Sequence, residues 1–286
     1  MQNSFRYFSR LPKIVRFAVT TRIRYPLADG RCLWRSLVAA FLYIAGMSAG
    51  LAEPPGLLGI KGEDDRVLVD SASYPWSAIG RVNKTVGGFC SGVLVAPRRV
   101  VTAAHCLWNV RAQRWLPASS LHFVAGYRRG DYLRHGQVAS YRLSDGARAP
   151  KGGATTDLAS DWALLTLKDG FDAALGSLKA ETLDPSRLAA LQQERAVFLH
   201  AGYSQDKAHI LTRHEPCRLI RFADRGRLIL HDCDATHGDS GSPILLRRGS
   251  EYRLVAIHVA TTTRNGHTLG VAIPATAFQA ELTSSR

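Results

Sequence analysis

Short apolar runs separated by turn residues dominate the chain from about residue 67 onward. Runs such as FCSGVLVA, WALLTL, AVFLHAGY, RLILHDC and RLVAIHVA are enriched in Val, Ile, Thr and aromatic residues, and none is as long as a typical helix. Gly, Asp, Asn and Pro stand between the runs, as is typical of tight turns between strands. The pattern predicts an all-β domain built from many short strands, either a sandwich or a barrel.

The first part of the chain has a different pattern. Residues 1–52 contain eight arginine or lysine side chains and one aspartate, which is +7 of the chain's net charge of +14. An uncharged apolar stretch, SLVAAFLYIAGMSAGLA, ends this leader at Ala52. A basic segment followed by an apolar one with small residues at its end predicts a secretory signal cleaved after Ala52, and therefore a secreted or periplasmic protein. The alternative is a membrane anchor, because the apolar stretch approaches the ~17–25 residues that a spanning helix needs.

The chain has 286 residues, of which 46% are hydrophobic, and is long enough for one large domain or two small ones. After the leader, its arginines are scattered, as in YRRG, CRLIRF and LLRRGS, without the dense basic patch that nucleic-acid binding requires. We therefore expect no nucleic-acid partner, and membrane contact only if the leader is an uncleaved anchor. We divide the chain into the leader 1–52, a mature N-terminal segment or short propeptide at 53–70, and the main domain at 71–286.

Four of the five cysteines follow the leader, and Cys32 lies within it. An even number of cysteines suits a disulfide-bonded exported protein, and we predict the pairs Cys90–Cys106 and Cys217–Cys233. For the second pair there is an alternative, because HEPC and HDC together offer a zinc set. Its members are His214, Cys217, His231 and Cys233. His231 and Cys233 would make an unusual chelate, so we favour the disulfide and expect no metal or other cofactor.

The segment THGDSGSPIL places Ser240 between an aspartate and a glycine, directly before an apolar run. A serine hydroxyl is a weak nucleophile until a neighbouring base accepts its proton, and that base works best when a third group holds it. Among ten histidines, His105 has the setting of such a base, because the apolar run in RRVVTAAHCLW ends in a tight turn there. In DLASDWALLTL, Asp161 stands directly before a strand, whereas Asp157 lies in a polar loop. We therefore take Asp161 as the orienting carboxylate.

The order of these three residues along the chain is His105, Asp161, Ser240. An α/β-hydrolase has the order Ser, Asp, His and a G-x-S-x-G turn, whereas this chain has Ser242 where the second glycine would stand. The order and the motif together exclude that fold.

Three motifs resemble those of the chymotrypsin/trypsin-like serine endopeptidases: VTAAHC around the base, DWALL around the carboxylate and GDSGSP around the nucleophile. They occur in the family's order and at family-like spacing, and the resemblance covers about residues 67–284. It implies two packed six-stranded antiparallel barrels with the site in the cleft between them. It places the N-terminal barrel at about 71–175, the C-terminal barrel at about 190–273 and a closing helix at about 274–284.

A narrower resemblance is to the bacterial glutamyl-endopeptidase branch of that family. The segment GEDDRVLVDSASYPWSAIGRV is similar to the mature start of that branch, and SGSP replaces the SGGP of digestive enzymes. His258 stands where the branch has a histidine in its specificity pocket. Asp239 departs from the branch, which usually has Asn or Gln before the serine.

The resemblance implies a monomeric endopeptidase that hydrolyses proteins or peptides through an acyl-enzyme. His105 is the expected general base and acid, and Asp161 holds its tautomer. The backbone N–H groups of Gly238 and Ser240 are expected to form the oxyanion hole, because glycine allows the amide to turn inward. One alternative is a catalytically idle homologue that binds a partner protein, which the complete triad disfavours. Another is a basic surface-binding protein, which the scattered charge disfavours.

Activation and substrate preference stay open from the sequence. Cleavage after Arg66 would give Val67 a new ammonium for Asp239, or an internal arginine would serve the same carboxylate; we favour no obligatory cleavage. Asp234 stands where trypsin-like enzymes bind Lys or Arg, and His258 stands where the glutamyl branch binds an acidic side chain. An aspartate favours a cation and a protonated histidine favours an anion, so both cannot dominate. We predict a weak preference for Glu or Asp before the scissile bond.

Overall fold

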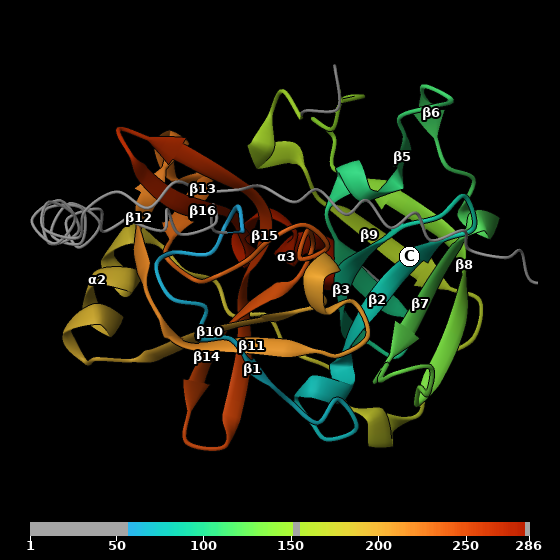
Figure 1. The fold of residues 1–286 in the computed structure, drawn as a ribbon, viewed down its shortest axis with the longest axis horizontal. Helices are drawn as coiled ribbons and strands as arrows, with labels where there is room; N and C mark the ends of the chain where they lie inside the picture. The colour runs from blue at the N-terminus through green and yellow to red at the C-terminus, as the bar shows by residue number, and fades with distance from the viewer. Residues whose placement is uncertain (1–56, 151–154, 284–286) are drawn as a thin grey trace, which may run out of the picture. The chain divides into compact units, whose positions relative to one another are not determined.

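The computed structural model describes residues 57–150 and 155–283 of the chain (Figure 1). The predicted leader, its cleavage after Ala52 and Cys32 lie outside the described residues. Within the described ranges, no helix is long and apolar enough to span a membrane. The described part consists mostly of antiparallel strands, which confirms the predicted all-β class.

Six strands of the first half form a closed antiparallel barrel. In barrel order they are β2 (Ile79–Lys84), β3 (Phe89–Ala96), β4 (Arg99–Thr102), β9 (Ala163–Leu167), β8 (Arg134–Leu143) and β7 (Leu121–Ala125). Apolar side chains such as Val93, Phe123 and Leu165 point into the barrel and are fully buried. A small hairpin, β5 (Trp108–Asn109) and β6 (Arg114–Trp115), follows β4, and its two tryptophan rings pack edge to face at 5.1 Å.

The second half forms an eight-stranded antiparallel sheet. Its order is β1 (Val67–Leu68), β11 (Thr212–Cys217), β10 (Val197–Gly202), β14 (Pro243–Arg248), β15 (Glu251–Arg264), β16 (His267–Pro274), β13 (Leu228–His231) and β12 (Leu219–Ala223). Only Arg218 separates β11, the second strand of this order, from β12 at its far end, so the chain passes directly between strands on opposite sides of the sheet. Counted as one bent strand, β11 and β12 give the predicted six strands, to which β1 adds an edge.

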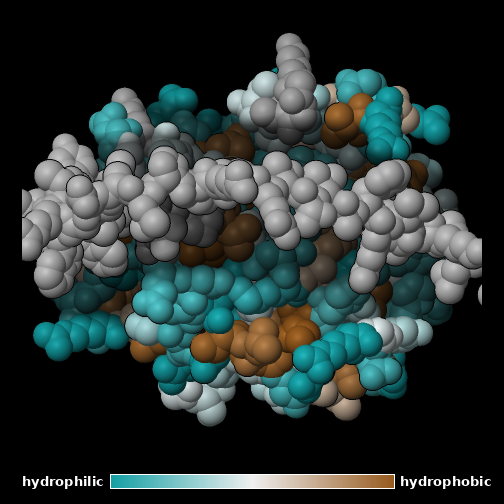
Figure 2. Space-filling view, viewed as in Figure 1, coloured by the Kyte–Doolittle hydropathy of each residue, from teal (hydrophilic) through white to brown (hydrophobic). Residues whose placement is uncertain are grey.

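The edge strand β1 leaves apolar side chains on the surface. Val67 and Leu68 are 48% and 57% exposed. Figure 2 shows an apolar patch, bordered by hydrophilic residues, on the face of the molecule that carries β1. The strand is therefore fixed by its backbone pairing with β11 rather than by burial of its side chains.

Two short helices accompany the strands. The predicted closing helix is a 3-10 turn at Ala275–Ala277 followed by α3 (Gln279–Thr283). Helix α2 (Pro185–Gln193) was not predicted, although its start carries a clear signal: the Asp184 side chain accepts the N–H of Arg187, and proline occupies the first turn. Its Leu188 and Leu191 pack into the core of the second sheet.

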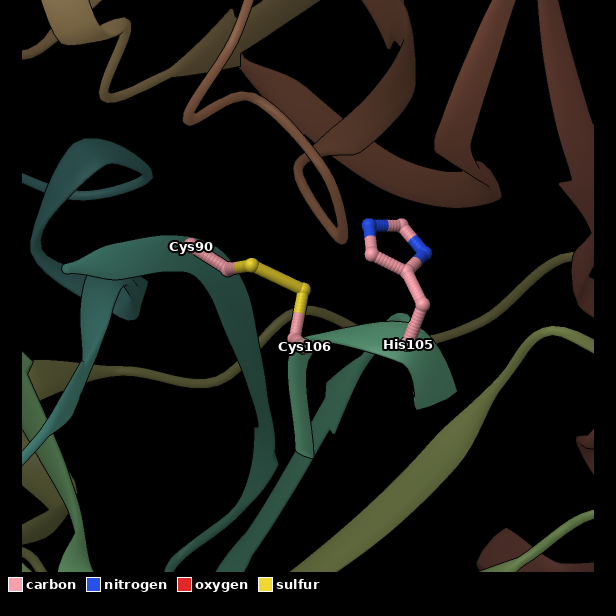
Figure 3. Close-up of side chains that lie close together, drawn as sticks. All are labelled: Cys90, His105 and Cys106. Atoms are coloured by element: carbon pink, nitrogen blue, oxygen red, sulfur yellow. A yellow bond between two sulfur atoms is a disulfide. The ribbon is translucent and has the colours of Figure 1, made fainter. Parts of the chain in front are cut away.

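The predicted disulfides Cys90–Cys106 and Cys217–Cys233 are both present. The first joins β3 to the turn after β4, and the second joins the end of β11 to the segment after β13. Because both cysteines of the alternative zinc set are used in the second bridge, the structure favours the disulfide over zinc. Figure 3 shows the first bridge beside His105, which extends from the same turn as Cys106.

Candidate active site

His105 and Asp161 come together because their two strands are neighbours. His105 lies in the 3-10 turn Ala104–Leu107 directly after β4, and Asp161 lies directly after the 3-10 turn Leu158–Ser160, just before β9. Strands β4 and β9 are paired, so the end of one lies beside the start of the other.

The Asp161 carboxylate holds both the backbone and the imidazole of His105. The Asp161 carboxylate lies 2.8 Å from His105 N and 2.6 Å from His105 Nδ1. The carboxylate is buried, and Thr155 Oγ1 donates a third hydrogen bond to it at 3.3 Å. With Nδ1 protonated toward the carboxylate, the lone pair of Nε2 is free to accept a proton.

Ser240 lies on the loop between β13 and β14, and it lines two cavities together with His105. The first, the His258 cavity, has a volume of about 400 Å³ and extends from His105 and Ser240 to His258 and Thr261. The second has a volume of about 250 Å³ and extends from the same pair toward Phe89 and the turn between β2 and β3. The base and the nucleophile therefore stand where two cavities meet.

The loop before Ser240 turns two backbone N–H groups away from internal acceptors. Gln205 N donates to the carbonyl of His237 at 2.5 Å, and Ser242 N donates to the carbonyl of Asp239 at 2.9 Å. In a trans peptide the N–H points opposite to the carbonyl, so the amides of Gly238 and Ser240 point away from these contacts. Neither amide donates to another residue of the described ranges. This arrangement suits an oxyanion hole.

Glycine is required at two positions of this loop. Gly238 has φ +97°, and a Cβ there would lie 2.5 Å from the carbonyl oxygen of Tyr203. Gly241 has φ +82°, and a Cβ there would lie 2.4 Å from the carbonyl oxygen of Ser91. Any side chain at either position would push the loop out of place.

Ser91 connects the first barrel to this loop, a role that the sequence did not reveal. Its N–H donates to the carbonyl of Ser240 at 2.9 Å, and its Oγ donates to the carbonyl of Gly238 at 3.0 Å. The same Oγ accepts the N–H of Tyr203 at 2.9 Å. Because Ser91 is fully buried, it holds the backbone of the nucleophile loop at a fixed distance from β3.

Asp239, next to the nucleophile, is a buried carboxylate whose charge is only partly compensated. Its Oδ2 accepts hydrogen bonds from Ser204 Oγ at 2.6 Å and Thr236 N at 2.8 Å, whereas its Oδ1 has no partner among the described residues. Burial raises the pKa of Asp239 to about 6, against the lowering effect of these hydrogen bonds and of the Arg66 charge.

An internal arginine reaches Asp239 through one hydroxyl group. Arg66 Nη1 donates to Ser204 Oγ at 2.8 Å, and that hydroxyl donates to Asp239. The guanidinium itself is buried and pairs with Asp64 at 2.8 Å and with Asp206 at 2.7 Å. In the uncut chain, the backbone after Arg66 enters β1 and pairs with β11, and the Arg66 side chain is the cation linked to Asp239 through Ser204.

His258 lines the His258 cavity and belongs to a group of three buried histidines. His231 Nε2 lies 3.1 Å from His258 Nδ1, and the ring of His200 packs edge to face against His258 at 5.9 Å. His200 in turn hydrogen-bonds Ser242. Gly270 on β16 makes room for the His231 ring, because a Cβ there would lie 2.1 Å from it.

Burial keeps these three imidazoles neutral. It lowers the pKa of His258 to about 3, with smaller contributions from the charges of Lys61 and His105, and it lowers the pKa values of His200 and His231 well below their ordinary range. This differs from the protonated His258 that the sequence argument assumed. The sequence also missed His200 entirely and treated His231 only as a possible zinc ligand, because their proximity to His258 depends on strand pairing.

Asp234 is not among the described residues that line the His258 cavity. It is fully buried, its Oδ1 accepts the N–H of Lys61 at 2.8 Å, and its Oδ2 lies 3.7 Å from His214 Nδ1. Residues 59–61 pack against the segment that contains Asp234. Gly59 lies so close to the neighbouring Ala235 that a Cβ on Gly59 would be 1.9 Å from the Ala235 carbonyl oxygen. In the structure, this carboxylate therefore contacts the N-terminal segment and does not line the His258 cavity.

Two groups of residues have ligand types suited to a metal ion. Asp65, His214 and Asp234 have ligand atoms within 4.8 Å of one another, as do Cys90, His105 and Cys106. In the first group His214 Nδ1 already accepts the N–H of Asp234 at 2.7 Å, and its Nε2 lies 3.3 Å from Asp65. In the second group the two cysteines form a disulfide. We therefore assign no metal to either group.

Comparison with known proteins agrees with this geometry. A family model described as a trypsin-like peptidase domain matches residues 90–257. The glutamyl endopeptidase of Bacillus licheniformis is 29% identical over 90 residues, which are 31% of this chain and only 27% of the length of that relative.

Solved structures share the fold at low sequence identity. A Glu endopeptidase in complex with MPD superposes with a TM-score of 0.62 at 18% identity, covering 79% of this chain and 97% of that one. The VesB protease of Vibrio cholerae superposes with a TM-score of 0.57 at 19% identity, covering 76% of this chain and 66% of that one. At these identities the similarity establishes the fold alone.

Proposed function

The chain belongs to the family of trypsin-like peptidase domains, and on that premise we propose that it is a serine endopeptidase, exported from the cell, with His105, Asp161 and Ser240 as its catalytic triad. The observation that carries the proposal is the double hydrogen bond between His105 and Asp161 at the point where Ser240 lines the same cavities. Two disulfides in the described domain support export, because such bonds persist mainly in oxidising compartments.

The proposed reaction proceeds through an acyl-enzyme. His105 Nε2 accepts the proton of Ser240 Oγ while that oxygen attacks the carbonyl carbon, and Asp161 stabilises the resulting imidazolium. The negative oxygen is bound by the N–H groups of Gly238 and Ser240, and one such donor is worth ~2.7–4 kcal/mol of transition-state stabilisation. The imidazolium then protonates the leaving amine as the C–N bond breaks. Water, deprotonated by the same imidazole, hydrolyses the ester and restores Ser240.

We further propose a preference for Glu or Asp before the scissile bond. The described residues that line the His258 cavity include no Asp, Glu, Lys or Arg. They do include His258 and several residues with hydroxyl groups. If His231 Nε2–H donates to His258 Nδ1, the proton of the neutral His258 is on Nε2 and can be donated to a substrate carboxylate. The position of Asp234 behind the cavity argues against a preference for Lys or Arg.

Steady-state hydrolysis of a peptide library tests both proposals. The wild-type protein is expected to cleave after Glu or Asp, and Ser240→Ala is expected to be inactive while melting at a similar temperature. His258→Ala should lose the acidic preference and keep the triad. Dominant cleavage after Lys or Arg, abolished by Asp234→Ala, would reject the acidic preference. A folded wild-type protein that cleaves no peptide would support the alternative, an idle homologue that binds proteins.

A further inference from the structure

The cavity that shares His105 and Ser240 with the His258 cavity, but does not include His258, has no assigned role. The 250 Å³ cavity is lined by His105, Ser240 and Gly238 at one end and by Lys84 and Gly88 at the other. Lys84 and Gly88 also line a neighbouring cavity of about 630 Å³, which continues to Trp108, Val110 and Arg111. We call these two cavities together the leaving-side groove.

The direction of a bound peptide follows from the two cavities that meet at Ser240. If the residue before the scissile bond enters the His258 cavity, the chain after that bond must leave Ser240 on the other side. The 250 Å³ part of the leaving-side groove is the cavity that shares His105 and Ser240 with the His258 cavity without including His258, and it is the path we infer for that part of the chain. Lys84 and Ser240 line the same 250 Å³ cavity, and an extended chain advances about 3.3 Å per residue, so the residues directly after the bond would pass along this lining.

Lys84 is half-buried and has no partner for its charge. It ends strand β2, its side chain lies beside Gly88, and its ammonium makes no hydrogen bond or ion pair with a described residue. Burial lowers the pKa of Lys84, and no neighbouring carboxylate opposes this effect. A lysine removed from water usually has a partner, because desolvating an unpaired ammonium is costly.

The other described lysines behave as expected. Lys61 donates to the carbonyl groups of Gly59 and Cys233, and Lys207 pairs with Asp64 and Asp206. Lys168 and Lys179 are exposed to water. Lys84 is therefore the one lysine of residues 57–150 and 155–283 that is half-buried without an acceptor.

The composition of the groove determines which ligand fits it. Its described lining contains no aspartate or glutamate, and Arg111 adds a second cationic side chain to that of Lys84. Val86 and Val110, each 57% exposed, give it apolar walls. The indole N–H of Trp108 has no acceptor among the described residues. A peptide with an acidic side chain would satisfy the ammonium and bury apolar surface at the same time.

We propose that Lys84 is a specificity determinant that selects an acidic side chain at the first or second residue after the scissile bond. The inference rests on the proposed peptidase function and extends it to the leaving half of the substrate. The carboxylate would bind the ammonium that the fold leaves unpaired, in a groove from which other carboxylates are absent among the described residues. A free C-terminal carboxylate has the same chemistry, and the test below separates the two sources.

The test uses internally quenched peptides that share one sequence before the scissile bond and carry Glu, Gln or Lys at each of the two positions after it. The peptides of this first set continue beyond these two positions and end in an amide. The peptides of a second set carry Gln at the tested position and end directly after it in a free carboxylate. We expect kcat/KM to be about tenfold higher for Glu than for Gln in one of the two positions, as for a partly desolvated ion pair. Lys84→Gln should bring the Glu/Gln ratio of kcat/KM close to one. Lys84→Glu should give the peptide with Lys a higher kcat/KM than the peptide with Glu.

The matched control is Lys168→Gln, which removes an exposed lysine outside the groove and should leave the Glu/Gln ratio unchanged. Thermal melting of each variant checks that it is folded. Equal kcat/KM for Glu and Gln, or a ratio that survives Lys84→Gln in the folded protein, would overturn the proposal. A preference seen only for free-acid ends would also overturn it. Absence of all hydrolysis by the wild-type protein would instead refute the proposed function.

Discussion

Replacing Asp239 with asparagine removes a carboxylate that the fold buries completely, while it keeps an oxygen in the place that accepts from Ser204 and Thr236. The folded protein raises the pKa of Asp239 from its ordinary 3.8 to about 6. Below pH 3.8 the group is protonated in the folded and the unfolded state, and its burial carries no charge cost. As the pH rises from 3.8 through about 6, the unfolded chain has lost the proton while the folded one still holds it, so stability falls.

The size of this effect follows from the two pKa values. One pKa unit corresponds to about 1.4 kcal/mol, so the interval from 3.8 to about 6 corresponds to about 3 kcal/mol of unfolding free energy. This contribution is fully present below pH 3.8 and is lost by about pH 7. The amide of the Asp239→Asn variant has no proton to lose and should contribute no such change. The buried histidines act in the opposite direction as the pH falls, but they do so equally in both proteins and cancel in the difference.

The assay is urea unfolding at constant salt, followed by tryptophan fluorescence, at several pH values from 3.5 to 8. Both proteins carry Ser240→Ala so that autolysis does not interfere, and both keep their disulfides. The unfolding free energy of the protein that retains Asp239, relative to that of the Asp239→Asn variant, should fall by about 3 kcal/mol across this range. If the difference in unfolding free energy stayed constant or rose with pH, burial would not raise the pKa of Asp239, contrary to what its unpartnered Oδ1 indicates.

Three further predictions concern the loop and its supports. Gly238→Ala should lower kcat by about 10²-fold or more and lower the melting temperature, because its Cβ would collide with Tyr203; unchanged kcat would contradict the oxyanion assignment. N-terminal mapping of active, probe-labelled protein should find the Arg66–Val67 bond intact, and Arg66→Met should lower kcat/KM. Activity that requires cleavage of that bond would refute the role of the internal arginine. Replacing both Cys90 and Cys106 with alanine should cost ~3 kcal/mol of unfolding free energy, measured with urea, because the bridge closes a loop across 16 positions.

The parts of the fold that local sequence determines were predictable. Short apolar runs bounded by turn residues predict the strands, and the segments around His105, Asp161 and Ser240 identify the candidate triad because each lies where an apolar run begins or ends. Helix α2 was missed although Asp184 and Pro185 mark its start. That signal is local and could have been used.

What could not be predicted depends on residues far apart in the chain. Asp234 accepts the backbone N–H of Lys61, which lies 173 positions earlier. Ser91 supports the loop of Ser240 from across the two halves of the domain. His200 and His231 reach His258 only through the pairing of separate strands. No pattern within a short window of sequence encodes these contacts.

The most direct test of the account is the site at which a serine-directed organophosphonate attaches to the folded protein. We expect one adduct per molecule, located on Ser240 by peptide mapping and absent from the His105→Ala variant. We also expect prior labelling to abolish peptide hydrolysis. An active, folded protein that forms no adduct, or that carries its adduct on another serine, would contradict the assignment of Ser240 as the nucleophile.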